Sequence, residues 1–194
     1  MFRIPLRHTS VSVGFCLFAL LLGAWPCPAL SHPHMFIKER VKALFAQDQL
    51  TGFSLEWRFD DLSTMGFLPQ RNPSAGPLRP EEVAQLKKIA FDNLRGYGYF
   101  THVRQGMRSI SVNRSEHFTA SLDGDRLVYR FSVYLASPLN VRHTPVVADF
   151  YDDTNYTALS FPENDSKAVT MSGNPAGCTI ARHDEPGGVT ITCN

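Results

Sequence analysis

The stretch Leu50-Thr51-Gly52-Phe53-Ser54-Leu55-Glu56-Trp57-Arg58-Phe59 decides the fold class of this chain. From Phe53 onward its large apolar residues, Phe53, Leu55, Trp57 and Phe59, stand at every second position, and smaller or polar residues separate them. Successive side chains of a β-strand point to opposite faces of the sheet, so this alternation predicts a strand with one buried face. The fold should therefore contain a β-sheet that has one face in the core.

Further strands are expected on both sides of this stretch. Residues 35–46 form a similar run, joined to it through Gln47-Asp48-Gln49, and Asp123-Gly124 is a hairpin turn signal further along the chain. The other predicted strands are residues 97–104, 107–112, 117–122, 127–135, 146–151, 156–161 and, on a weaker pattern, 167–171. Short connections of this kind predict a largely antiparallel arrangement.

One main helix is expected at about residues 80–95. Pro80 and Glu81-Glu82 suit its first turn, where the backbone N–H groups have no helical partner, and Gly96 suits its end. The apolar residues at helical spacing are Val83, Leu86, Ile89, Ala90 and Leu94. The predicted fold class is therefore α+β, with mainly antiparallel strands and one main helix.

The C-terminal residues predict a β-hairpin closed by a disulfide. Cys178 and Cys193 flank two short apolar runs around a Pro-Gly-Gly turn. If Ile180 faces Ile191, the same register sets the two cysteines opposite each other, with Cα atoms about 4.5 Å apart. A metal-binding or redox pair would require closer spacing, such as Cys-x-x-Cys. We therefore expect a structural disulfide.

Residues 1–31 have the three zones of a secretory signal peptide. A short basic start is followed by an apolar run, and the small side chains of Ala29 and Ser31 suit signal peptidase. The alternative is a membrane anchor, but the apolar run is shorter than the roughly 20 residues that span a bilayer. We expect cleavage after Ser31 and a single periplasmic domain of residues 32–194 without a membrane span.

The charge of the expected mature chain excludes one class of function. Residues 1–31 hold two of the 19 basic residues and none of the 18 acidic ones, so their removal leaves 17 against 18. The mature chain has no run of lysine or arginine. Because nucleic-acid binding depends on a basic surface, we expect no nucleic-acid partner.

Cleavage after Ser31 would leave His32-Pro33-His34 as the new amino terminus. An N-terminal histidine can bind a metal with its amine and its imidazole, and His34 would point to the same side if Pro33 is extended. Such nitrogen donors suit Ni, Co, Cu or Zn. The alternative is that the three residues are a frayed tail. Further ligands would come from the folded domain, and the candidates are His102, His117, His143, His183, Asp60, Asp61, Asp149 and Asp152.

Two acidic segments rich in aromatic residues, 57–61 and 151–156, supply Asp60 and Asp152 among these candidates. Paired carboxylates can act as acid and base or as metal ligands. Aspartates also stabilise turns at strand ends through their side chains, which is the favoured interpretation here. Because no nucleophile motif, P-loop, dinucleotide loop or zinc-protease motif is present, we expect a binding protein rather than an enzyme.

The window Arg71–Glu82 has the length of a calcium-binding EF-hand loop, with a glycine at its sixth place and Glu82 at its twelfth. Calcium requires oxygen ligands at the first, third and fifth places, where this chain has Arg71, Pro73 and Ala75. We therefore expect no calcium binding.

Several segments together resemble a family of bacterial periplasmic proteins known as domain of unknown function 1007. The matching segments are 32–37 directly after the signal, 57–61, 93–101, 150–152 with Tyr156, and Gly177-Cys178. The resemblance implies the periplasmic component of an ABC-type transport system, with genes often near nickel and cobalt transporters. Members often carry an Asp-rich stretch before the helix, which this chain lacks.

These observations lead to three hypotheses. The first is a periplasmic accessory protein that binds a transition metal, or hands it to an inner-membrane metal transporter, through His32 and His34. The second is an interaction module that docks on an inner-membrane transporter or another envelope partner without metal. The third is an oxidase that uses copper bound by the N-terminal histidine, and it would require another imidazole from the folded domain.

Overall fold

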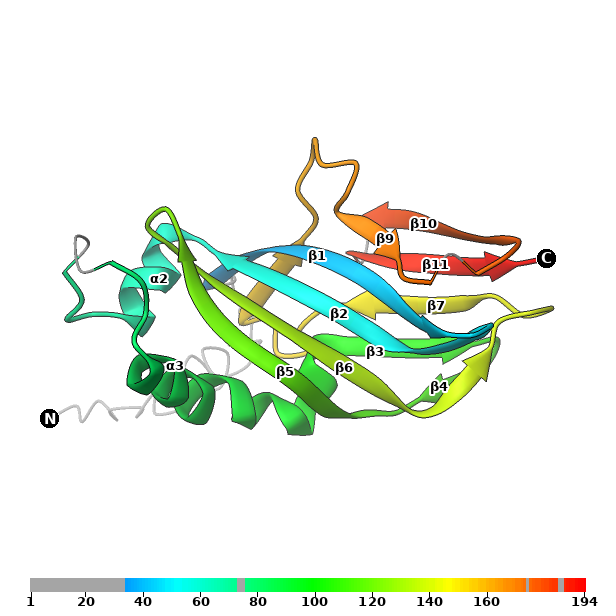
Figure 1. Cartoon of the computed structure of the whole chain (residues 1–194), viewed down its shortest axis with the longest axis horizontal. Helices are drawn as coiled ribbons and strands as arrows, with labels where there is room; N and C mark the ends of the chain where they lie inside the picture. Colours follow the sequence, from blue (N-terminus) through cyan, green and yellow to red (C-terminus); the bar gives the residue numbers. More distant parts are fainter. Residues whose placement is uncertain (1–33, 73–75, 174, 185–186) are drawn as a thin grey trace, which may run out of the picture. The chain divides into compact units, whose positions relative to one another are not determined.

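Two β-sheets make up most of the described chain. The computed structural model describes residues 34–72, 76–173, 175–184 and 187–194, so the predicted signal peptide and His32 lie outside it. The larger sheet, sheet A, has the strand order β5-β6-β2-β1-β8, with β9 also paired to β1. The smaller one, sheet B, has the order β10-β11-β7-β3-β4 (Figure 1). The fold is mainly β with some helix, as the alternation of residues predicts.

The bounds of the strands agree with most of the predicted runs. Sheet A contains β1 (Met35–Ala46), β2 (Gln49–Phe59), β5 (Val112–Asp123), β6 (Arg126–Asn140), β8 (Thr157–Ser160) and β9 (Val169–Met171). Sheet B contains β3 (Thr101–Gln105), β4 (Arg108–Ile110), β7 (Val146–Phe150), β10 (Cys178–Asp184) and β11 (Gly187–Cys193). Pairing is mostly antiparallel, but β8 and β9 both run parallel to β1.

Strand β2 lies in the middle of sheet A and provides much of its core face. Its four alternating residues Phe53, Leu55, Trp57 and Phe59 are all buried, which confirms the predicted strand. On β6 the partners of the first three are Val133, Phe131 and Tyr129, which are buried as well. Direct cross-strand pairs of aromatic and aliphatic side chains are a main source of sheet stability.

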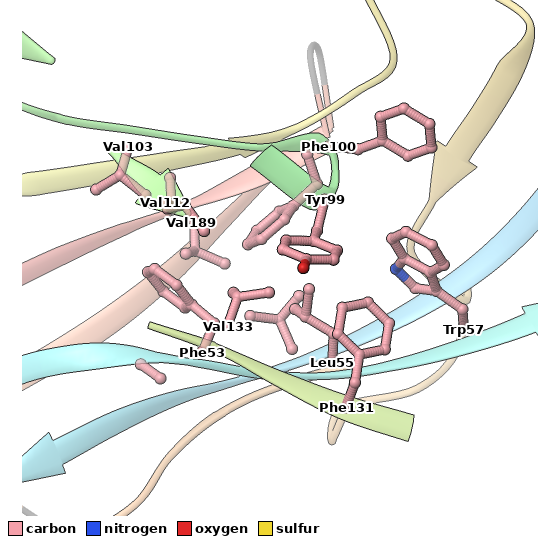
Figure 2. Packing of buried hydrophobic residues seen from close by; sticks show 14 of the residues in the cluster. Phe53, Leu55, Trp57, Tyr99, Phe100, Val103, Val112, Phe131, Val133 and Val189 are labelled. Atoms are coloured by element: carbon pink, nitrogen blue, oxygen red, sulfur yellow. The ribbon is translucent and has the colours of Figure 1, made fainter. Parts of the chain in front are cut away.

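The core lies between the facing sides of the two sheets. Phe53 of sheet A packs edge to face on Phe150 of sheet B, with ring centroids 5.8 Å apart. Within sheet A the rings of Trp57 and Phe131 meet at 4.8 Å in the same manner. Figure 2 shows these residues of sheet A together with Val103 and Val189 of sheet B in one cluster. Edge-to-face pairs of this kind add to the hydrophobic stabilisation of a core.

The main helical segment begins at Pro80, as predicted, but changes its type along its length. An α-helix, α3 (Pro80–Leu86), continues into a π-helical turn, η1 (Lys87–Phe91), and a 3₁₀ segment, η2 (Asp92–Phe100). Phe91 packs on Phe118 of β5 and Phe131 of β6, with centroids 4.3 and 4.7 Å away. The segment therefore covers the core face of sheet A at these two strands. No helix in the described ranges is both long enough and apolar enough to cross a membrane.

The predicted strand at 97–104 is wrong in its first half. Residues Gly98, Tyr99 and Phe100 have φ angles of 58°, 54° and 56°, so they are left-handed and end the 3₁₀ segment instead. Strand β3 begins only at Thr101. Apolar aromatic residues alone favour a strand, but here burial of Tyr99 and Phe100 against sheet A outweighs this local preference.

A short helix that the sequence pattern did not predict follows β2. Helix α2 (Asp61–Phe67) begins after Asp60, whose side chain accepts a hydrogen bond of 2.7 Å from the backbone N–H of Ser63. This is an N-cap, the arrangement that satisfies one of the unpaired N–H groups of a first helical turn. A helix of two turns has too short an apolar pattern to be distinguished from a turn.

The C-terminal hairpin has the predicted register. Cys178 pairs with Cys193 and Ile180 with Ile191 across β10 and β11. The two cysteines form a disulfide, and their Cα atoms are 4.0 Å apart. The side-chain period of two thus placed both pairs correctly from sequence alone.

Candidate functional site

A hollow lined mainly by aromatic side chains lies where the helical segment meets sheet A. Its volume is about 220 Å³. It is formed by residues of β1, β2 and β6, of α2, of the segment 90–100, and of the turn 152–157 that precedes and begins β8. We call it the aromatic hollow. Its aromatic lining residues are Trp57, Phe59, Phe67, Tyr97, Phe100, Tyr129 and Tyr156.

The aromatic hollow is next to a shallower one that includes His34. This second hollow, of about 470 Å³, shares Met35, Phe67, Ala90 and Tyr156 with the first. Because the two have a common rim, a group bound near His34 would lie close to the opening of the aromatic hollow. The start of β1 is therefore the part of the described chain where apolar walls and a predicted metal ligand meet.

His34 is fixed to the body of the domain by its backbone. Its N–H donates to the carbonyl oxygen of Tyr156 at 2.8 Å, and the N–H of Met35 donates to the same oxygen at 3.2 Å. The imidazole ring lies 5.2 Å from the ring of Tyr156, at an angle of 41°. The side chain of His34 is otherwise exposed to solvent. The residue is thus held at a defined place and its ring nitrogens remain accessible.

Two of the aspartates predicted as further ligands, Asp60 and Asp152, lie near the start of β1, and both have structural hydrogen bonds. Asp60 caps α2, and its backbone N–H donates to Phe36 at 3.1 Å. Asp152 accepts from the N–H and the hydroxyl of Thr154, at 2.8 and 2.7 Å, and from the N–H of Thr157 at 3.0 Å. Burial alone would raise the pKa of Asp152, but these hydrogen bonds outweigh it and the pKa is lowered.

No group of three side chains able to hold a metal is found among residues 34–72, 76–173, 175–184 and 187–194. Asp61 forms an ion pair with Arg126 at 2.8 Å, and His117 and His143 are exposed elsewhere.

A second polar cluster occupies the outer face of sheet B. The ring of His183 on β10 reaches over Gly188 of β11 to Asp149 on β7, with Nε2 and Oδ1 2.7 Å apart. Arg104 lies 3.6 Å from the other oxygen of Asp149. His102, on the next strand, stacks on Tyr151 at 3.9 Å. A His–Asp hydrogen bond with a nearby arginine on a sheet surface is adequately explained as a structural interaction.

Glu39 is the most unusual charged residue near the aromatic hollow. It lies on the core face of β1, 1% exposed, and accepts a 2.6 Å hydrogen bond from the indole N–H of Trp57. Burial raises the pKa of the Glu39 carboxyl to about 8, against the opposing effect of the indole N–H. The carboxyl is therefore mostly protonated at neutral pH, and the side chain enters the core as a neutral group.

Tyr129 is the second buried polar group. Its hydroxyl is fully covered and has no hydrogen-bond partner in the described part of the chain. Burial raises the pKa of this hydroxyl. The ring is surrounded by Phe59, Phe67 and Phe118, with centroids 4.8, 6.3 and 5.0 Å away. A buried hydroxyl without a partner is uncommon in native proteins and calls for a physical explanation.

The sequence pattern identified His34, Asp60 and Asp152 but not the lining of the hollow. Glu39 could have been found, because it interrupts the apolar alternation Ile37, Val41, Ala43 of β1 at a core-facing position. The hollow itself could not, because its walls come from strands, helices and a turn that are distant in sequence.

The fold and the hollow define a two-sheet, mainly β domain with a ligand-sized apolar depression beside its amino-terminal strand. The chain belongs to the family described as "Protein of unknown function (DUF1007)", whose model matches residues 17–187. It is similar to the "Uncharacterized 15.5 kDa protein in trpE 3'region" of Spirochaeta aurantia, at 36% identity over 55% of this chain and 76% of the relative. It is also similar to an "Uncharacterized protein" of Haemophilus influenzae, at 26% identity over 83% of this chain and 77% of the relative.

Proposed function

We propose that the protein is an exported accessory protein of a transport system and binds one transition-metal ion through His32 and His34. The observation that carries this proposal is the attachment of His34 to Tyr156, with the backbone hydrogen bond of 2.8 Å and the adjacent rings. A frayed tail would have no such attachment. Because His34 is held in place, a metal bound by it would have a fixed position on the surface.

The donor set follows from the chemistry of the terminus. After cleavage behind Ser31, the amine and imidazole of His32 and the imidazole of His34 would offer three nitrogens to Ni, Co, Cu or Zn. Pro33 has no amide proton to lose, so the backbone cannot supply a fourth nitrogen at that position. The coordination shell is left incomplete, which suits an ion that is passed on to an inner-membrane transporter.

The aspartates near the start of β1 contribute negative charge to this place. The oxygens of Asp152 already accept three hydrogen bonds, and Asp60 is an N-cap. A carboxylate oxygen has more than one lone pair, so each can still accept a water bound to the metal. We therefore assign Asp60 and Asp152 the role of outer partners that favour a cation.

Native mass spectrometry of the exported protein tests this proposal. We expect a mass that starts at His32, one bound ion when Ni, Co, Cu or Zn is supplied at micromolar concentration, and loss of that ion in a His32→Ala, His34→Ala variant. His143→Ala is the matched control, since His143 is exposed and lies elsewhere in the fold. A metal-free protein under all four ions, or an unchanged stoichiometry in the double variant, would contradict the proposal.

A second candidate function is docking on an inner-membrane transporter without metal. It is favoured by three exposed apolar side chains, Leu62, Met65 and Ile89, which are 73%, 68% and 53% exposed. Leu62 and Ile89 line the second hollow, and Met65 lies on the same helix, α2, as Leu62. Large apolar residues gathered on a surface often mark a protein contact. If docking is the function, a Leu62→Ser, Met65→Ser variant should lose co-purification with the transporter in the presence of a chelator. Met107→Ser, at a fully exposed site in the β3–β4 turn, should retain it.

A further inference from the structure

We propose that a hollow on the outer face of sheet A binds a phosphate-type oxyanion that carries about two negative charges. The hollow measures about 300 Å³. Its basic lining residues are Arg40, Lys42, Arg130 and Lys167, and we call it the basic hollow. This inference is independent of the metal proposal, because none of these residues is among the proposed metal ligands.

The alternation of the strands brings the basic residues of this hollow to one face. Arg40 and Lys42 are exposed positions of β1, and the residues on either side of each are buried. Arg130 is likewise exposed between two buried residues of β6. Glu56 of β2 is the direct cross-strand partner of both arginines. Because successive side chains of a strand point to opposite faces, these side chains all lie on the face turned away from the core.

The last cation of the basic hollow comes from the other side of β1. Lys167 lies just before β9, which runs parallel to β1. The direct partner of Lys42 on β9 is Thr170, whose side chain also lines the hollow. The four cations therefore come from two neighbouring strands, β1 and β6 on either side of β2, and from the segment that leads into β9.

Glu56 holds the two arginines in position. Its Oε1 accepts from Nη1 of Arg40 at 2.6 Å, and its Oε2 accepts from Nε of Arg130 at 2.6 Å. Asp165 accepts from Nε of Arg40, also at 2.6 Å. Each guanidinium keeps its Nη2 group without a hydrogen-bond partner among the described residues. An arginine that is already held in place loses less side-chain entropy when it binds an anion.

The basic hollow has an excess of positive charge. Within the described ranges, Lys42 and Lys167 form no ion pair with an acidic side chain. Glu56 is the one acidic residue of the lining, and Asp165 binds Arg40 from outside it. Four cations thus face two carboxylates, which leaves two positive charges to be balanced. The expected mature chain has 17 basic and 18 acidic residues, so this excess belongs to the place and not to the whole surface.

The charge and the donors together favour a phosphate group. A phosphate monoester carries about two negative charges at neutral pH, whereas a carboxylate carries one. Guanidinium and ammonium groups both bind phosphate, and the hydroxyls of Ser54 and Thr170 add donors to the lining. A cavity of about 150 Å³ holds one benzene ring, so a hollow of about 300 Å³ has room for a diphosphate or for a small group attached to the phosphate.

Lysine footprinting of the exported protein tests this inference. The chain has five lysines, which are Lys38, Lys42, Lys87, Lys88 and Lys167. We expect pyrophosphate, added with EDTA so that no metal contributes, to slow acetylation of Lys42 and Lys167 several-fold and in a saturable manner. Lys87 and Lys88, which are exposed on η1, should react as before, and sodium chloride of equal ionic strength should protect none of the four.

Two results of the footprinting would overturn the inference. One is the absence of saturable protection up to about 10 mM pyrophosphate, a concentration at which even a weak complex is formed. The other is equal protection of Lys42 and Lys88, which would show that pyrophosphate only screens the charge of the surface.

A pair of double variants separates the hollow from the overall charge. Lys42→Gln, Lys167→Gln should weaken pyrophosphate at least tenfold in isothermal titration calorimetry, because hydrogen bonds to charged groups are among the strong ones. Lys87→Gln, Lys88→Gln removes the same charge elsewhere and should keep the affinity within about twofold. All four lysines are exposed, so both variants should fold. Equal weakening in the two variants would contradict the assignment.

The source of the phosphate group is tested with the same monoester in two forms. Glycerol phosphate presents it in solution, and phosphatidylcholine vesicles that contain phosphatidate present it on a membrane. Protection by glycerol phosphate without sedimentation on the vesicles would identify a soluble phosphate compound. Sedimentation that is lost in Lys42→Gln, Lys167→Gln would identify a lipid headgroup. Sedimentation that persists unchanged in this variant, without protection of Lys42 and Lys167, would count against the basic hollow.

Discussion

Glu39 and Trp57 are direct cross-strand partners on β1 and β2, and the indole N–H of Trp57 donates to the Glu39 carboxyl at 2.6 Å inside the core. A carboxyl at this place costs stability whenever it is ionised, because burial penalises the charged form. Its pKa of about 8, against an ordinary value of 4.5, shows how strongly the core prefers the protonated group. The pair therefore couples the stability of the domain to pH.

The first prediction is that the free energy of unfolding of the wild type falls as pH rises, and that Glu39→Gln abolishes this fall. Between pH 4.5 and about 8 the unfolded chain has an ionised Glu39 while the folded chain keeps its proton. The contribution of the protonated Glu39 to the free energy of unfolding is thus fully present below pH 4.5 and is lost as pH rises through 8. The slope of the free energy of unfolding is up to about 1.4 kcal/mol per pH unit. Urea unfolding at several pH values should show this slope in the wild type and a flatter curve in Glu39→Gln.

The matched control for that series is Glu163→Gln, since Glu163 is exposed on the surface. Its curve should run parallel to that of the wild type. If Glu39→Gln also runs parallel to the wild type, the carboxyl is ionised in the folded protein and its protonation at neutral pH is disproved. The indole signal of Trp57 should titrate in the same pH range, because its hydrogen-bond acceptor changes charge.

The second prediction concerns the window 71–82, where the guanidinium of Arg71 contacts the oxygens that a calcium loop would offer to its ion. The guanidinium of Arg71 donates to Glu82 at 2.6 Å, to the carbonyl of Pro77 at 3.0 Å and to that of Gly76. In a calcium loop the seventh and twelfth places supply oxygens to the ion, and here those places are Pro77 and Glu82. The guanidinium thus takes the oxygens that an ion would otherwise bind.

We expect Arg71→Met to increase amide hydrogen exchange in residues 76–86, because the loop loses its internal cation. Arg79→Met is the comparison, since Arg79 is 74% exposed and lies 3.3 Å from Glu82, and it should have a smaller effect. The hydrogen bonds from the Arg79 backbone and from Arg71 lower the pKa of Glu82 to about 2, so both contacts persist at neutral pH. Stabilisation of the wild type by millimolar calcium would contradict this account.

Local patterns predicted the strands of this protein well and its helices less well. The alternation in β2 and the Ile180–Ile191 register depend on side-chain period, which is a local property, and both were confirmed. Helix α2 and the 3₁₀ segment that ends at Phe100 were missed or misassigned. Their conformation depends on the Asp60 cap and on burial against sheet A, and a short apolar pattern does not contain that information.

The candidate site was likewise predictable from local sequence patterns only in part. The position of His34 beside Tyr156 depends on the parallel pairing of β1 with β8, which is a contact between the two halves of the chain. Sequence spacing could propose His34 and Asp152 as ligands but could not place them near the same end of β1. The partnerless hydroxyl of Tyr129 is likewise a property of the packed fold, since an isolated Tyr in a strand predicts only burial.

The third prediction is that Gly52→Ala strongly destabilises the protein. An added Cβ at Gly52 would lie 2.1 Å from the carbonyl oxygen of Val133, which is backbone and cannot move aside without disturbing the β2–β6 pairing. The chain has an irregularity of register at this point. We expect a loss of about 3 kcal/mol or more in urea unfolding, the range of severe core substitutions.

The comparison variant is Gly66→Ala, in helix α2, where an added Cβ meets nothing within 4 Å. Alanine has a higher helix propensity than glycine, so this variant should be neutral or more stable by up to about 1 kcal/mol. Similar losses in both variants would show that the close approach of Val133 is not the cause.

The fourth prediction uses the disulfide to test both stability and the state of the amino terminus. Cys178 and Cys193 are 15 residues apart, and closing a loop of that length stabilises by roughly 3 kcal/mol in the chain-entropy model. Reduction should lower the unfolding free energy by about that amount, and reductant should have no effect on a Cys178→Ser, Cys193→Ser variant.

If cleavage follows Ser31, the two cysteines of the signal, Cys16 and Cys27, are removed. The exported protein should then have no free thiol in denaturant, whereas two free thiols would show that residues 1–31 are retained and that no amine of His32 is available to bind a metal.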